Sequence, residues 1–394
     1  MAQLNGVVID KLQGGLNRAA TSTDSHVALI VNPVADVDVN AAIGNTGSGL
    51  KLTSLFAAES IGINAALDAN EGINLHKQVV DFFRLAPLGT LYLFNSKVAA
   101  DMIVFIKTNP DVKGFALQEG VAIVLTQPAV LAAQQLDVID ALALENRLID
   151  FGIIGIDGFG IADAVDLRVL DTPQMSVCVA SGNADSLVNL GALLGMIAAR
   201  RVNENLASVN IQNKPINSRG SRDYPLTDEN SGAWLKAYMA DGTEVNNLTA
   251  AQLADLEVKG YIVAASYQGY AGVFFTNSHT AIDISSDYAY IENNRVWNKA
   301  ARLIRATLIP QIKGVVKKDP ATGFIKSTTA SQWTAAANKA LETMVINDEI
   351  SGFQVAIDNK QIVNSSNPVF IQALIVADGI VHKFEVALGL TNSI

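Results

Sequence analysis

Apolar residues in the first two-thirds of the chain form short continuous runs, and stretches with helical spacing separate these runs. The helical stretches are 75–85, 130–146 and 185–205. The apolar runs are rich in β-branched and aromatic residues, as are strands buried on both faces of a mostly parallel sheet. They lie at 26–31, 90–94, 121–125, 149–156 and 175–180. This alternation predicts an α/β domain that extends from residue 26 to residue 260.

The strongest helical periodicity lies in the last third of the chain, between residues 286 and 316. Pro310 should kink or end this helix. Its predicted apolar stripe consists of Trp297, Ala300, Ala301, Ile304 and Leu308. A second helix, at about 330–346, has a similar stripe of Trp333, Ala337, Leu341 and Met344. We expect these two long helices to form the frame of a C-terminal domain over residues 261–394.

The end of the chain has strand character. Residues 352–358 alternate in polarity, 368–377 are nearly all apolar, and Asp378 with Gly379 is a strong two-residue hairpin signal. The last run, 380–390, also alternates. One of its faces carries Phe384, Val386, Leu388 and Leu390, and the other carries Lys383 and Glu385. These segments predict a small sheet packed on the two helices.

The first 25 residues contain a single short apolar strand, formed by Val7, Val8 and Ile9 and followed by Asp10. Gly14, Gly15 and a polar stretch come next. A strand this short has little to pack against locally, so residues 1–25 are predicted to be an arm. The expected organisation is therefore an arm over 1–25, an α/β domain over 26–260 and a C-terminal domain over 261–394.

The composition is apolar for a chain of this length. Hydrophobic residues make up 49% and charged residues 17% of the 394 residues. The longest apolar runs fall short of the ~20 residues that a membrane-spanning helix needs. The N-terminus lacks the pattern of a secretory signal. We therefore expect a protein made in a cytoplasm, without membrane insertion, that buries much apolar surface in its core or against other subunits.

The charge balance argues against bulk binding of nucleic acid, because the formal net charge is −10. One cysteine, Cys178, lies in an apolar run, so an internal disulfide is excluded and a buried strand residue is expected. The four histidines, His26, His76, His279 and His382, are scattered and lack the spacing of metal ligands. We expect no catalytic, cofactor-binding or metal site.

Two glycine-rich segments partly resemble nucleotide-binding loops. Residues 44–54 have the glycine spacing of a P-loop, but Leu50 stands where the lysine should be and Lys51 comes one place late. We interpret this segment as a loop that opens a helix, and an α/β nucleotide-binding enzyme that uses it is the alternative hypothesis. The glycines of 152–163 are out of register with a dinucleotide fingerprint and predict a strand end with a tight turn.

One charge pattern stands out on the long C-terminal helix. Between residues 290 and 318 there are seven basic residues and one acidic residue, Glu292. Arg295, Lys299, Arg302 and Arg305 recur at helical spacing, and Lys313, Lys317 and Lys318 continue the pattern. Such a basic face is either a solvated helix surface or a docking surface for an electronegative partner.

Three segments, in order, resemble contractile tail sheath subunits of phage tails, R-type bacteriocins and related injection machines. They are residues 49–94, residues 285–312 with an arginine opening a long helix, and the alternating closing run 382–390. The resemblance implies a helical polymer of stacked rings around an inner tube, which contracts by rigid-body rearrangement of metastable subunits.

The resemblance also implies roles for particular residues. The arms Val7 to Asp10 and Lys383 to Leu388 would pass to neighbouring copies and add strands to their sheets. The basic helix from Arg295 to Arg305 would face the inner tube. The implied partners are further copies of the chain, the inner tube protein, and baseplate and terminator proteins, in a phage tail or an injection-machine particle.

Overall fold

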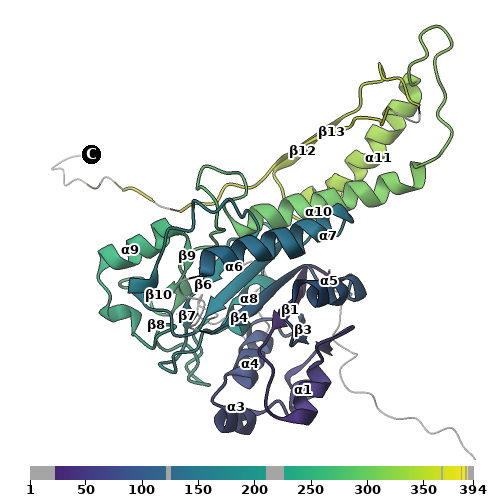
Figure 1. Ribbon diagram of the computed structural model, residues 1–394. Coiled ribbons are helices and arrows are strands. Elements are labelled where there is room, and N and C mark those ends of the chain that lie inside the picture. The colour runs from purple at the N-terminus through teal and green to yellow at the C-terminus, as the bar shows by residue number, and fades with distance from the viewer. Residues whose placement is uncertain are drawn as a thin grey trace, which may run out of the picture.

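The computed structural model describes residues 23–120, 126–209, 226–364, 367–382, 384–386 and 388. The expected arm strand Val7 to Asp10, the expected strand 121–125 and Leu390 lie outside these residues. The described chain forms an α/β body and a C-terminal module of two long helices that projects from it (Figure 1).

The body is built around a seven-stranded sheet of order β2-β3-β1-β4-β5-β6-β9. The central strands pair in parallel, and β2 pairs with β3 in the antiparallel direction. The strands are β1 His26–Ile30, β2 Leu50–Leu52, β3 Thr90–Phe94, β4 Gly114–Glu119, β5 Phe151–Ile156, β6 Met175–Cys178 and β9 Tyr261–Ile262. The predicted mostly parallel α/β fold is therefore confirmed.

Helices connect and cover the strands. The helices of the body are α1 Val37–Ile43, α2 Leu55–Glu59, α3 Ala65–Glu71, α4 Leu75–Leu85, α5 Ala99–Thr108, α6 Gln127–Gln134, α7 Ala141–Leu144, α8 Leu190–Ala199 and α9 Ala250–Lys259. A π-helical segment, Gln135–Asp140, joins α6 to α7. The prediction for 75–85 coincides with α4. The prediction for 185–205 was too long, because Asn189 caps the first turn of α8 through a bond from the Ala192 amide.

Short strand pairs complete the body. They are β7 Ala180–Ser181 with β8 Tyr238–Met239, and β10 Ala264–Ala265 with β11 Phe274–Phe275. The predicted domain boundary at residue 260 stays a prediction. The large sheet itself continues to β9, which is bonded to β6.

The C-terminal module consists of α10 Ile291–Leu308, α11 Ser327–Ile346, β12 Gly352–Ala356 and β13 Gln372–Val376. Helix α10 ends two residues before Pro310, as predicted, and Pro310 lies in the 3-10 turn that follows. A second apolar core joins the two helices and the small sheet; it includes Ala300, Ala337, Leu341, Met344 and Val355.

Two predictions for the module are wrong. Trp297 was expected in the buried stripe of α10, but 48% of its surface is exposed. The hairpin expected at Asp378 and Gly379 is also absent, because residues 377–382, 384–386 and 388 form no strand. The Asp378 carboxylate instead accepts hydrogen bonds from the Ser351 hydroxyl and the Asn203 amide, which direct the chain away from β13.

Candidate functional site

The last described residues carry uncovered apolar side chains. Phe384 is 83% exposed, Val386 82% and Leu388 91%. Their spacing of two places all three on one face of an extended chain. In Figure 1 this segment leaves the C-terminal module and extends beyond the body. Apolar surface exposed in this periodic way fits a strand that pairs with another polypeptide.

The small sheet of the module has room for further strands. β12 and β13 pair in antiparallel register, with Phe353 opposite Ile375 and Val355 opposite Ala373. These four side chains pack toward the second core. Each of the two strands has one neighbour among the described residues, so each leaves an open edge. A two-stranded sheet is marginally stable by itself, and added strands stabilise it.

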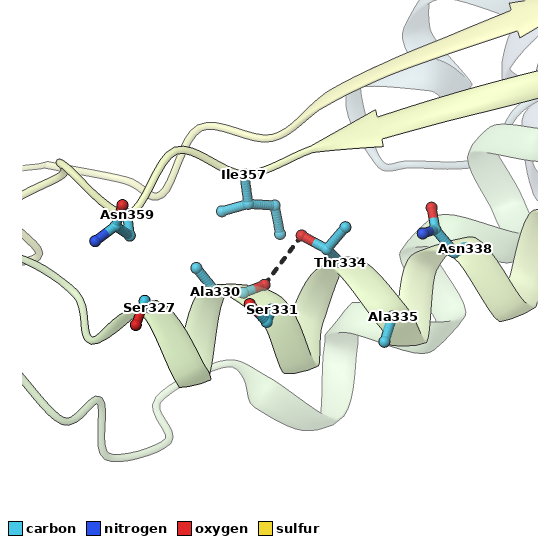
Figure 2. A pocket seen from close by; sticks show the side chains of 8 residues that line it. All are labelled: Ser327, Ala330, Ser331, Thr334, Ala335, Asn338, Ile357 and Asn359. Atoms are coloured by element: carbon cyan, nitrogen blue, oxygen red, sulfur yellow. Dashed lines mark hydrogen bonds between the residues drawn. The ribbon is translucent and has the colours of Figure 1, made fainter.

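A groove runs along α11 beside this sheet. Its first part has a volume of about 290 Å³ and is shown in Figure 2, where Ile357 and Asn359 come from the chain that leaves β12. The α11 side chains that line this part are small or polar: Ser327, Ala330, Ser331, Thr334, Ala335 and Asn338. A second part, of about 490 Å³, shares Asn338 and continues to Val345. Small side chains allow another chain to approach α11 closely at this groove.

The structure places three of the four predicted basic residues inside the protein. Arg295 is 2% exposed, and its guanidinium donates to the carbonyl oxygen of Arg201. Lys299 Nζ lies 2.6 Å from a carboxylate oxygen of Asp24 and 2.6 Å from one of Glu349. The expectation of an exposed basic face is therefore wrong for Arg295 and Lys299.

Arg302 is also used within the chain. Its guanidinium donates to both carboxylate oxygens of Asp150, at 2.6 and 3.2 Å, and Asp150 is buried. Burial by itself would lower the pKa of Arg302, but the charge and hydrogen bonds of Asp150 outweigh it and raise the pKa. Arg305 is exposed and donates to the Asn146 side chain at 2.9 Å. The contact with an inner tube stays a prediction.

The exposed part of the basic pattern lies beyond α10. Lys313, Lys317 and Lys318 are exposed residues of the connection between α10 and α11. This connection forms the end of the C-terminal module that is farthest from the body (Figure 1). Ile312 and Val315 in the same connection are 66% and 98% exposed. We call residues 312–318 the basic tip.

A buried polar network at the start of α10 was missed by the sequence reasoning. Glu292 is 3% exposed and accepts hydrogen bonds from Ser278 at 2.5 Å and Asn205 at 2.9 Å. Burial raises the pKa of Glu292, although the Ser278 hydrogen bond opposes the shift. Asn294 and Asn298 share this buried side of α10. Their spacing of four was the available signal that this face of the helix is polar.

Three aromatic rings contact one another where the terminal segment passes α10. His382 lies 5.0 Å from Tyr290, centroid to centroid, and Tyr290 lies 5.3 Å from His279. His279 Nε2 is 2.6 Å from a carboxylate oxygen of Glu257. Burial lowers the pKa of His279, and the Glu257 hydrogen bond partly offsets this. Two of the four histidines, His279 and His382, therefore contact the same tyrosine ring.

The loop 44–54 does not have the geometry of a P-loop. Residues 44–49 lead into strand β2, and helix α2 begins after Ser54, whose hydroxyl accepts from the Ala57 amide. The expected helix is therefore present but starts three residues later than predicted, and strand β2 was not predicted. Gly49 has a φ of +60°, and a Cβ there would lie 2.6 Å from the Leu93 carbonyl oxygen, so this glycine has a packing role.

The other chemical candidates have structural explanations. Gly158 has a φ of +70° in the turn after β5, which confirms the predicted strand end and tight turn. Cys178 is buried in β6, and burial raises the pKa of its thiol to about 12. Within the described ranges no three His, Cys, Asp or Glu side chains are grouped to hold a metal ion. No helix in the described part of the chain has the length and apolar character to cross a membrane.

These features define the class of the protein: a mixed α/β protein with a mostly parallel central sheet and a projecting helical C-terminal module. The chain belongs to the DUF2586 family. Residues 4–279 match the N-terminal domain of that family, and residues 287–394 match its C-terminal domain.

The sequence is similar to that of a phage protein. The chain is 33% identical over 122 residues to a protein of Haemophilus phage HP1 (strain HP1c1) that is provisionally named a tail sheath protein. The match covers 31% of this chain and only 28% of the length of that relative.

Two solved structures are similar. A chain of the anti-feeding prophage baseplate has a TM-score of 0.58 at 14% identity, covering 99% of this chain and 100% of its own. A sheath tail protein from Desulfitobacterium hafniense has a TM-score of 0.49 at 9% identity, covering 94% of this chain and 100% of its own. The family match and the likeness to the phage HP1 protein agree with the resemblance to the contractile tail sheath family, and the likeness to the baseplate chain shows a shared fold.

Proposed function

We propose that the protein is a structural subunit of a contractile tail sheath, which polymerises around an inner tube in a phage tail or a related particle. The sequence match to the phage HP1 protein and the shared fold of the baseplate chain support a structural role in such a tail. The single observation that carries the proposal is the terminal segment, whose Phe384, Val386 and Leu388 are exposed on one face.

In this proposal the terminal segment of one copy adds a strand to the small sheet of the next copy. The open edges of β12 and β13 supply main-chain hydrogen-bonding groups, and the groove along α11 leaves space beside the sheet. The N-terminal strand Val7 to Asp10 acts as a second exchanged arm. Each copy donates to one neighbour and receives from another. Such head-to-tail contacts form rings where the rotation between copies closes, and the rings stack into a helical tube.

Contraction is then a rearrangement of rigid subunits that remain joined by their arms. The extended array is metastable, and a gain of a few kcal/mol per subunit, summed over the tube, is enough to drive it. No nucleotide is consumed. The alternative of a nucleotide-binding enzyme that uses residues 44–54 is not favoured, because Leu50–Leu52 form strand β2 where a P-loop would open a helix.

The proposed partners follow from the same arrangement. We assign two exposed basic features of the C-terminal module to the contact with the inner tube. They are the basic tip, with Lys313, Lys317 and Lys318, and Arg305 near the end of α10. Baseplate and terminator proteins would cover the two ends of the sheath. Synthesis takes place in the bacterial cytoplasm, before incorporation into the particle.

The proposal is tested by removing the apolar face of the terminal segment. A variant with Phe384→Ser, Val386→Ser and Leu388→Ser should fold but remain unassembled, because a polar strand gains little from burial on a neighbour. The matched control is Glu385→Ser, on the opposite face of the same segment. Sedimentation and electron microscopy measure assembly. Tubes formed equally by the triple variant and the wild type would contradict the proposal.

A further inference from the structure

Lys299 lies where three separate segments of the chain meet. Its ammonium group on α10 contacts Asp24, which precedes β1, and Glu349, which follows α11. Both N–O distances are 2.6 Å, and the three side chains are between 9% and 17% exposed. The contacts are therefore largely shielded from solvent. Ion pairs shielded in this way are screened less by salt and cost more to break than exposed pairs.

The surroundings of Lys299 make these contacts specific. Arg302 pairs with Asp150. Arg295 donates to the Arg201 carbonyl oxygen and, at 3.5 Å, to the main-chain carbonyl oxygen of Asp24, whereas Lys299 contacts the Asp24 carboxylate. Glu349 Oε2 has no hydrogen-bond partner among the described residues, which leaves Lys299 as the group that neutralises this carboxylate. Removing the ammonium would leave a buried carboxylate without a counter-ion.

The chain positions of the two carboxylates suggest what the contact does. Asp24 comes two residues before His26, the first residue of β1, which lies in the large sheet between β3 and β4. Everything before it belongs to the proposed N-terminal arm. Glu349 comes three residues before β12, the first strand of the small sheet. Lys299 thus connects the base of the arm to the base of the small sheet.

We propose that Lys299 is a positioning residue that fastens the base of the N-terminal arm to the C-terminal module. A pull on the arm then passes through Asp24 to α10 and Glu349, and the end of β1 is shielded from it. The load itself arises in the polymer, so this part of the inference rests on the proposed function. The fastening exists in the isolated subunit and is measured there.

Hydrogen–deuterium exchange of the isolated full chain tests the fastening. In Lys299→Met, amide exchange around residues 24–27 should rise by about tenfold, because an opening equilibrium changes by that factor when one charge-assisted hydrogen bond is lost. The control Lys313→Met makes the same substitution in the exposed basic tip and should leave exchange unchanged. Wild-type exchange at 24–27 in Lys299→Met would overturn the inference.

Asp24→Asn provides a second variant that leaves the Lys299 contact with Glu349 in place. Asp24→Asn should raise amide exchange at 24–27 without affecting exchange in β12. Combining it with Lys299→Met should raise exchange at 24–27 little further, because both substitutions remove the same contact. A simple sum of the two effects on exchange at those amides would overturn the inference.

The polymer provides an independent measurement. Sheaths of Lys299→Met should fragment more often on contraction than those of Lys313→Met, as counted by electron microscopy. Equal fragmentation would overturn the transfer of load. If the wild type formed no polymer at all, the proposed function would fail, whereas the exchange result on the isolated subunit would still decide the fastening.

Discussion

Asp157, the residue that follows β5, shows how burial sets the charge of one carboxyl group. It accepts hydrogen bonds from the Val188 amide at 2.8 Å and from the Gln118 side chain at 3.0 Å. Burial nevertheless raises the pKa of Asp157 to about 6. The folded state therefore binds a proton more tightly here than the unfolded chain does, and ionising Asp157 opposes folding.

This gives a prediction with a defined sign. As pH rises from 4 to 7.5, ionisation of Asp157 should lower the free energy of unfolding by up to roughly 3 kcal/mol. Asp157→Asn removes the ionisation, so the variant should gain stability relative to the wild type at pH 7.5 and much less at pH 4. Urea unfolding at both pH values measures this. Asp287→Asn, on an exposed residue, is the control, and an equal difference at both pH values would contradict the account.

Individual residues also show the limit of the sequence reasoning. Arg295, Lys299 and Arg302 were predicted to form a basic face because they recur at helical spacing. Their partners come from distant segments, such as Asp150 just before β5 for Arg302 and Asp24 just before β1 for Lys299. Periodicity along one helix cannot show where those partners lie.

At the scale of elements, the packing of α4 against α8 depends on a close approach of two backbones. A Cβ added at Gly191 would collide with the Gln78 carbonyl group on α4. Gly191→Ala would gain about 1 kcal/mol from the higher helix propensity of alanine. The backbone of Gln78, however, cannot move aside as a flexible side chain would.

Gly191→Ala should therefore destabilise the protein by about 1–3 kcal/mol, despite the better helix former. Thermal or urea unfolding measures the change. Gly352→Ala is the control, because a Cβ there meets no atom within 4 Å. A Gly191→Ala variant as stable as the wild type would show that α4 and α8 do not approach this closely.

Elements with strong local patterns were predictable, and those defined by their neighbours were not. β1, β3, β5 and β6 are continuous apolar runs and were predicted close to their bounds. β4, Gly114–Glu119, was missed because its sequence ends in Gln118 and Glu119 and lies next to the more apolar run 121–125. Its strand conformation comes from pairing with β1 on one side and β5 on the other.

For the whole molecule, the pattern of exposure separates the two parts of the chain. The body buries the central strands of its sheet, with 0% exposure at Leu29, Leu93 and Ile154. The C-terminal module leaves apolar side chains uncovered on its sheet, its basic tip and its terminal segment, including Leu374, Val315 and Phe384. Sequence alternation predicted a strand at 380–390 paired with β13 through a hairpin, but the described residues of this run form no strand. A hairpin signal acts locally, whereas Asp378 is held by the distant residues Ser351 and Asn203.

The central claim is that the ends of the polypeptide are completed by neighbouring copies. A cryo-EM map of assembled wild-type protein tests it most directly. The account predicts density for the terminal segment of one copy, including Phe384, Val386 and Leu388, as an added strand beside β12 or β13 of another copy. A map in which each terminal segment folds back onto its own subunit, with no strand shared between copies, would contradict the account.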